Sequence, residues 1–106
     1  RILVESSLPK CPQPYNVKTW INCNGAYQAE DGHRYSGDFG PNGEYEGYGI
    51  VIWKGDKYEG QFQNGKAHGQ GKKEFVNGDV YEGQFENGVM HAKKCFKNAL
   101  LHRYEL

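Results

Sequence analysis

The sequence of 106 residues is poor in the aliphatic side chains that fill most globular cores, and its formal net charge is zero. Hydrophobic residues make up 37% of the chain, and the mean hydropathy is −0.88. This composition argues against a thick core between two layers of secondary structure, and no apolar run is long enough for a membrane-spanning helix. Because charge is balanced and aromatic residues reach 14%, intrinsic disorder is not expected either.

Glycine and aromatic residues take the place of the missing aliphatics. The chain has 15 glycines and eight tyrosines. Aromatic rings bury large areas and pack edge to face, so a few of them can form a core. The composition therefore predicts a thin sheet whose apolar surface is made of rings.

An internal repeat organises the middle of the chain. Tyr35, Tyr58 and Tyr81 each open a Tyr-x-Gly-x-Phe unit, and an Asn-Gly pair follows each unit. Within a unit the side chains alternate, with Tyr58, Gly60 and Phe62 on one face. Such alternation predicts a half-buried antiparallel strand, and Asn-Gly predicts a hairpin turn.

Glycine weakens a strand, so its recurrence inside these units needs a physical reason. We expect that the missing side chain lets a neighbouring ring lie flat across the backbone. Each repeat is then one hairpin that is stabilised by the next hairpin along the chain. The sequence predicts an all-β fold of consecutive antiparallel β-hairpins in one elongated, twisted sheet, with structural glycines at Gly37, Gly60, Gly69, Gly71 and Gly83.

The pattern Tyr-x-Gly-x-Phe-x-x-Gly-x-x-His-Gly-x-Gly, matched from Tyr58 to Gly71, resembles the MORN (membrane occupation and recognition nexus) repeat. The resemblance implies a hairpin ribbon, and it implies dimerisation in some members of the family. It predicts an irregular, proline-containing N-terminal arm at 1–21, a repeat sheet at 22–96 and a C-terminal cap or tail at 97–106. The sheet divides into a partial repeat at 22–34, repeats at 35–57 and 58–80, and a partial repeat at 81–96.

The last repeat departs from the pattern. After His91 the expected Gly-x-Gly is replaced by 92–94, which read Ala-Lys-Lys. Terminal repeats are commonly atypical because they cap the stack. The apolar residues that we expect to fold back as a cap, with a frayed tail as the alternative, are Leu100, Leu101, Tyr104 and Leu106.

Cys11 and Cys23 flank the second half of the arm. A disulfide between them would tie the arm to the sheet, contribute ~2–3 kcal/mol of stability and imply an oxidising compartment. The arm also resembles N-terminal segments of exported bacterial MORN-like proteins, so we expect a periplasmic or secreted protein. The chain begins at Arg1, which is expected of either a processed protein, if a signal peptide existed, or a fragment. Two free thiols in a cytoplasmic protein remain the alternative.

No pattern in the sequence predicts catalysis, a cofactor or a metal site. His68 and His91 are equivalent turn residues, and a zinc site from His91 and Cys95 would need more ligands than the spacing supplies. The Gly-x-Gly pairs lie within strands and do not open a helix, as a phosphate site would require. We therefore expect a protein that is not an enzyme.

The charge distribution limits the partners. Between 35 and 88 there are five basic and nine acidic residues, which gives about −4, whereas the tail from 89 onward is about +3. An acidic sheet is repelled by nucleic acid and by anionic lipid. Nucleic acid is therefore not expected as a partner, and membrane binding is not supported by the charge of the repeats.

The leading functional hypothesis is a binding or scaffold module that contacts an unknown protein or peptide through its aromatic and glycine face. The alternatives are a membrane- or envelope-associated lipid-binding protein, and a structural protein that self-assembles, for instance as a homodimer, through its open sheet edges. The same rings would instead be a covered core if the arm or the tail packs over them. The predicted binding residues are Tyr35, Phe39, Trp53, Tyr58, Phe62, Phe75, Tyr81 and Phe85.

Overall fold

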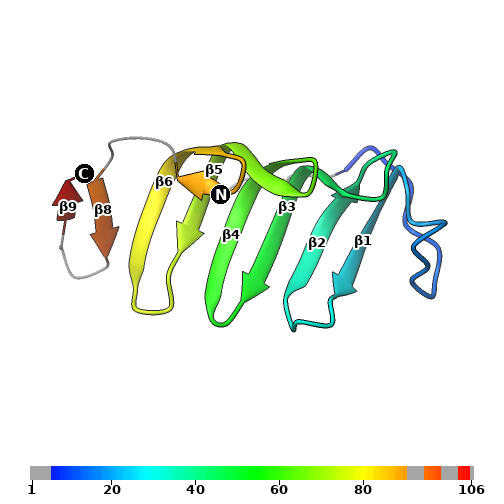
Figure 1. The fold of residues 1–106 in the computed structure, drawn as a ribbon, viewed down its shortest axis with the longest axis horizontal. Helices are drawn as coiled ribbons and strands as arrows, with labels where there is room; N and C mark the ends of the chain where they lie inside the picture. The colour runs from blue at the N-terminus through cyan, green and yellow to red at the C-terminus, as the bar shows by residue number, and fades with distance from the viewer. Residues whose placement is uncertain (1–5, 91–94, 99–102, 106) are drawn as a thin grey trace.

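The computed structural model describes residues 6–90, 95–98 and 103–105, the last two ranges as backbone only. In this part of the chain it is all-β, with no helix, and the strands form one open antiparallel sheet (Figure 1). The predicted ribbon of consecutive hairpins is confirmed. None of the described residues forms a helix of the length and apolarity that crossing a membrane requires.

The strands follow one another across the sheet in chain order, so that neighbours in sequence are neighbours in space (Figure 1). Val89–Met90 and Cys95–Asn98 both pair with the preceding long strand, at its two ends. The strands are β1 (Cys23–Gln28), β2 (Arg34–Phe39), β3 (Tyr45–Trp53), β4 (Asp56–Gln63), β5 (Lys66–Glu74), β6 (Asp79–Glu86), β7 (Val89–Met90), β8 (Cys95–Asn98) and β9 (Arg103–Glu105).

Asn-Gly pairs form the tight turns of two hairpins. In Asn64-Gly65 and Asn87-Gly88 both residues have positive φ, between 51° and 86°. Such φ values match a turn whose twist fits the flanking strands. The pair at 42–43 differs, because only Gly43 has positive φ there and the connection from β2 to β3 is a longer loop.

A continuous row of glycines crosses the six long strands. Gly25 on β1 is paired with Gly37 on β2, and each following strand adds one paired glycine, as far as Gly83 on β6. Tyrosine rings lie over this row: a Cβ added at Gly49 would lie 2.6 Å from Cε1 of Tyr35. A Cβ at Gly37, Gly49, Gly60 or Gly71 would occupy the space of a tyrosine ring or its hydroxyl, which agrees with the expected reason for these glycines. The predicted structural glycine Gly69 differs, because it lies outside the row and has a φ of 91°. The members of the row are Gly25, Gly37, Gly49, Gly60, Gly71 and Gly83.

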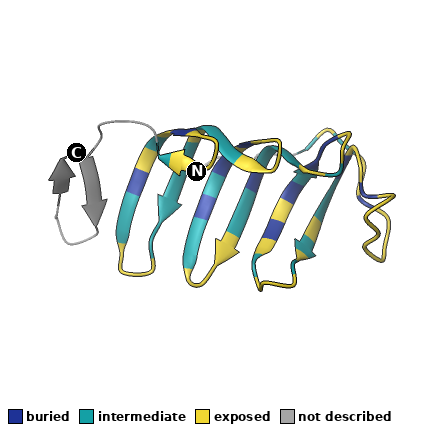
Figure 2. Ribbon diagram, in the orientation of Figure 1, coloured by how far each residue is buried: buried dark blue, intermediate teal, exposed yellow. Residues whose placement is uncertain are grey.

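The hydroxyls of the three repeat tyrosines are paired in the same way. Tyr35 Oη donates to the carbonyl of Asp38 at 2.6 Å, and Tyr58 and Tyr81 repeat this bond three residues on, at 2.7 and 3.0 Å. Each ring can therefore be buried without an unsatisfied polar group. Buried residues recur along the strands, while the hairpin turns are largely exposed (Figure 2). The core consists of Cys11, Trp20, Cys23, Tyr35, Phe39, Tyr58, Phe62, Tyr81 and Phe85.

The N-terminal arm closes the first end of the sheet. Cys11 and Cys23 form the predicted disulfide, and Lys10 forms a parallel bridge with Asn24 on β1. Trp20 is 1% exposed, and its ring packs edge-on against the ring of Phe39, at a centroid distance of 5.3 Å.

Trp20 also lies over the glycine row, because a Cβ added at Gly25 would lie 2.8 Å from its Cζ3. This is the relation that Tyr35 has to Gly49 and that Tyr58 has to Gly71. Trp20 therefore supplies the ring that a complete preceding repeat would have supplied. The arm acts as an N-terminal cap of the array.

The predicted cap residues Leu100, Leu101 and Leu106 lie outside the described residues, as do 91–94, where the repeat pattern departs. Tyr104 lies in β9, which pairs with β8. The prediction of a C-terminal cap therefore stays a prediction.

Candidate functional site on the aromatic face

The face of the sheet that carries the repeat tyrosines and the glycine row is called the aromatic face here, and the opposite face the polar face. Of the predicted binding residues, six are buried, with exposed fractions from 1% or less to 7%. Trp53 is 43% exposed, and Phe75 lies between these extremes. The six rings that form the core are Tyr35, Phe39, Tyr58, Phe62, Tyr81 and Phe85.

In the described part of the arm, Trp20 and Tyr15 cover the β1–β2 end of this face. Farther along, the rings bury one another in edge-to-face pairs. Phe62 is 5.2 Å from the ring of Tyr35 and 5.1 Å from the ring of Tyr58. Such pairs are favourable beyond the area that they bury.

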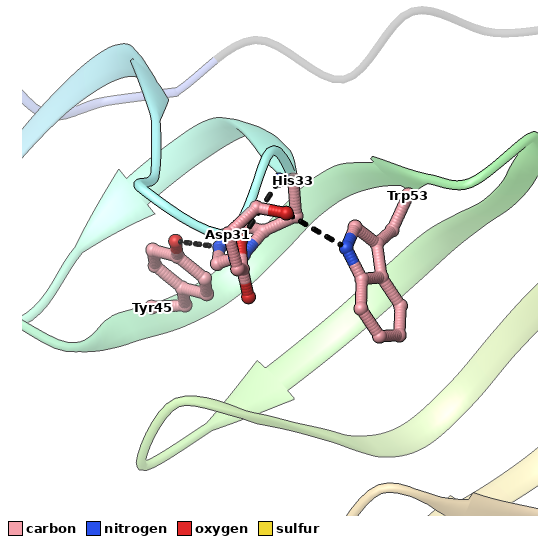
Figure 3. Close-up of polar contacts among 4 residues, drawn as sticks. All are labelled: Asp31, His33, Tyr45 and Trp53. Carbon is pink, nitrogen blue, oxygen red and sulfur yellow. Dashed lines mark hydrogen bonds and ion pairs between the residues drawn. The ribbon is translucent and has the colours of Figure 1, made fainter.

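Tyr45, the first residue of β3, folds over the aromatic face. Its ring stacks on the ring of Tyr35, with centroids 3.8 Å apart and planes within 5°. Its hydroxyl lies 2.5 Å from Nε2 of His33, and Nδ1 of His33 lies 2.7 Å from Oδ1 of Asp31 (Figure 3). A hydrogen-bonded chain of carboxylate, imidazole and phenol therefore holds the Tyr45 ring in place.

The hydrogen-bonded series of Asp31, His33 and Tyr45 resembles a catalytic arrangement only in the order of its chemical groups. The hydrogen bond from the backbone N–H of His33 lowers the pKa of the Asp31 carboxyl, so it is ionised at neutral pH. Burial raises the pKa of Tyr45 to about 12, so its hydroxyl stays protonated and is a poor nucleophile. The arrangement positions a ring.

Alkaline pH is expected to destabilise the protein through its buried tyrosines. Burial raises the pKa of Tyr45 and Tyr58 to about 12, and that of Tyr35 in the same direction, whereas an unfolded tyrosine titrates near ~10. Above about pH 10 the unfolded state releases protons that the folded state keeps. The free energy of unfolding should then fall, by at most about 1.4 kcal/mol per pH unit for each tyrosine. Urea unfolding from roughly pH 9 to 12 measures this, and an unchanged midpoint would contradict it.

A groove of about 430 Å³ lies on the aromatic face between the first and second full repeats. Its walls are largely apolar, and the exposed ring of Trp53 borders it, with Nε1 donating to the carbonyl of Asp31 at 3.4 Å (Figure 3). We call it the aromatic groove. It is lined by Asp31, His33, Tyr45, Val51, Trp53, Tyr58, Phe62, Gly65, Lys66, Ala67, Asn87 and Gly88.

Charges of opposite sign lie at the two ends of the aromatic groove. Asp31 belongs to the turn between β1 and β2, and Lys66 begins β5 after the turn from β4. These two turns lie at opposite ends of the strands (Figure 1). The groove therefore has an apolar middle and no net charge from these two residues.

The polar face has a different character. Lys72 and Glu74 form an exposed ion pair at 3.3 Å, and the Tyr48 hydroxyl donates to Glu59. Exposed pairs of this kind contribute little to stability. Among the described side chains, no group of three histidines, cysteines or carboxylates could hold a metal ion.

The turn histidine His68 has a structural contact. Its Nδ1 accepts a hydrogen bond from the backbone N–H of Asn87 at 3.4 Å, and Glu46 accepts one from the N–H of Asn64 at 3.2 Å in the preceding repeat. Each hairpin turn is thus tied to the hairpin before it.

The family comparison agrees with this architecture. A family model described as MORN repeat matches residues 58–80 and 81–93. Residues 58–93 are MORN repeats. Residues 35–57 form an equivalent hairpin, with the same glycine row, tyrosine bond and turn contact. No curated protein matches the chain.

Sequence reasoning missed three residues that shape the aromatic groove: Tyr45, Ala67 and Asp31. A signal was present, since Tyr45 precedes Gly47 by two residues just as Ala67 precedes Gly69. That relation becomes meaningful only when the paired register shows that both positions face the groove.

Proposed function

We propose that the chain is a protein-binding MORN module that holds a segment of a partner protein in the aromatic groove. The observation that carries the proposal is the groove itself, which has apolar walls and an exposed tryptophan at its border. Its volume of about 430 Å³ lies within the range of roughly 300–1,000 Å³ that is usual for binding pockets. Tryptophan is among the residues that contribute most to protein interfaces.

The proposal shifts the contact surface relative to the sequence prediction. Six of the eight predicted rings are buried in the core, and two of these, Tyr58 and Phe62, line the groove. Trp53 would contact the partner directly. The module is proposed as a binding protein and not as an enzyme, because the Tyr45 hydroxyl is protonated and already bonded to His33. The Cys11–Cys23 disulfide supports an oxidising, exported location, which stays a prediction.

Binding of a partner segment in the aromatic groove can be tested by substituting two neighbouring residues that lie on opposite faces of the sheet. Trp53 borders the aromatic groove, whereas Ile52, which is 45% exposed, points to the polar face. Peptides would be selected on the immobilised protein from a phage-displayed random library, and their affinities measured by calorimetry. Trp53→Ala should weaken binding by about tenfold or more, because it removes the exposed ring. Ile52→Ala is the matched control and should leave affinity unchanged.

Two results would contradict the proposal. One is a library selection that yields no peptide. The other is a set of peptides whose binding is lost with Ile52→Ala and kept with Trp53→Ala, which would place the binding surface on the polar face.

A further inference from the structure

The residue that opens the second strand of each hairpin differs among the three repeats. Tyr45 lies opposite Phe39, Ala67 opposite Phe62, and Met90 opposite Phe85 in the paired registers. The backbone confirms the equivalence, since the carbonyl of Tyr45 accepts from Gly65 N at 3.0 Å and that of Ala67 from Gly88 N at 2.8 Å. Two of the three positions carry a long side chain, and the middle position carries a methyl group.

In the first repeat the long side chain covers the repeat tyrosine. Tyr45 stacks on Tyr35 at 3.8 Å, and its ring also lies edge-on to Phe62, at 5.9 Å. Tyr35 is 1% exposed as a result, and Tyr81, whose repeat carries Met90, is 0% exposed. Tyr58, whose repeat carries Ala67, is 7% exposed. The repeat tyrosine beside the alanine is the most accessible of the three.

The aromatic groove coincides with this missing side chain. Tyr58, Phe62 and Ala67 all line it, together with the turn residues Asn87 and Gly88. The backbone N–H of Gly88 donates to the carbonyl of Ala67. We infer that the groove receives an aromatic side chain, most fittingly a tyrosine, of the partner segment, which stacks on Tyr58 as Tyr45 stacks on Tyr35.

The electrostatics of the groove suit such an occupant. Asp31 and Lys66 oppose each other in sign at its two ends, so a charged side chain would gain from one and be repelled by the other. An uncharged phenol avoids this conflict, and its hydroxyl can hydrogen-bond with either rim group. The ring would pack offset or edge-on among the aromatic walls, the geometry that aromatic pairs prefer.

This inference rests on the proposed function and names the side chain that the groove selects. The test begins with N-acetyl-tyrosinamide as the probe and N-acetyl-leucinamide as its aliphatic counterpart, both titrated into the protein and followed by NMR. The tyrosine probe should give saturable shifts of the Trp53 indole N–H, with a dissociation constant in the millimolar range expected for a ligand of about 16 non-hydrogen atoms. The leucine probe should bind at least roughly tenfold more weakly.

Ala67→Tyr is the decisive variant, because it would give the second repeat the tyrosine ring that Tyr45 provides in the first repeat. The probe should lose at least tenfold in affinity, and the melting temperature should rise by several degrees as the groove fills. Ala26→Tyr is the matched control, since it adds the same side chain at an exposed site on the polar face. Its probe affinity should equal that of the unmodified chain.

A second pair of substitutions keeps the test informative if Ala67→Tyr disturbs the fold. Combining Tyr45→Ala with Ala67→Tyr conserves the number of rings and should move the site from Tyr58 to Tyr35, so that the probe shifts move with it. Equal binding of the two probes, or a folded Ala67→Tyr variant that binds the tyrosine probe as before, would overturn the inference.

The outcomes for the inference and for the proposed function are separable. Selected peptides that need Trp53 but contain no aromatic residue would overturn the inference and leave the proposed function intact. A tyrosine probe that binds and is displaced by Ala67→Tyr, in a protein for which no peptide is selected, would support the inference and count against a protein partner.

Discussion

Replacing Gly49 by alanine is expected to lower the free energy of unfolding by about 3 kcal/mol, which is large for the addition of a single methyl group. The new Cβ would lie 2.6 Å from Cε1 and 2.7 Å from Oη of the Tyr35 ring, well inside contact distance. Tyr35 is 1% exposed and stacked under Tyr45, so its ring has no free space to enter. Urea unfolding followed by tryptophan fluorescence measures the change.

A double-mutant cycle separates crowding of the ring from other effects of the methyl group. In a Tyr35→Leu background the planar ring is absent, so Gly49→Ala should cost much less than it does in the unmodified chain. The same cost in both backgrounds would show that the ring is not the reason for the glycine, and the explanation of the glycine row would be wrong.

Replacing Trp20 by alanine is expected to destabilise the protein by about 3–5 kcal/mol. The indole is almost completely buried, it packs against Phe39 at 5.3 Å and Tyr15 at 5.1 Å, and its Nε1 donates to the carbonyl of Pro12. Loss of the indole would expose the rings at the β1 end of the sheet. In the unmodified chain the arm covers these rings in place of a complete repeat. Thermal and urea unfolding under non-reducing conditions measure the loss while the Cys11–Cys23 disulfide is retained.

Val17→Ala is the control for this substitution, because Val17 lies in the same arm and is 67% exposed. It should change stability by less than roughly 0.5 kcal/mol, as surface substitutions usually do. If Trp20→Ala costs no more than Val17→Ala, the Trp20 ring does not cap the sheet energetically.

The sequence predicted the strands of the repeat array well because the signals for them are local. Alternation of Tyr58, Gly60 and Phe62 identifies a half-buried strand, and Asn64-Gly65 identifies its turn, without reference to any other part of the chain. Four of the predicted structural glycines belong to the glycine row, whereas Gly25 and Gly49 were recognised only from the paired register. A ring two residues away needs space across the backbone, and only glycine leaves it.

The candidate site was harder to predict because it depends on differences between repeats. Tyr45 and Ala67 occupy equivalent positions, but the insertion before Gly47 obscures this in the sequence, and only the register opposite Phe39 and Phe62 reveals it. Six of the eight predicted rings belong to the core and Trp53 borders the groove, while their role in binding stays a prediction. The number of these rings that a partner can contact depends on how the turns and Tyr45 cover the aromatic face, which the sequence does not show.

By itself, the sequence determined that this protein is an open sheet of β-hairpins, since period-two alternation, Asn-Gly turns and strand glycines each act within a few residues. It also carries the MORN repeat pattern at 58–93. The tertiary structure decided which rings are core and which remain accessible. It placed Trp20 over Gly25 and Tyr45 over Tyr35, and it placed the methyl group of Ala67 at the equivalent position beside Tyr58. These contacts join residues of different strands or of the aperiodic arm, so their geometry depends on packing between elements, which local sequence signals do not encode.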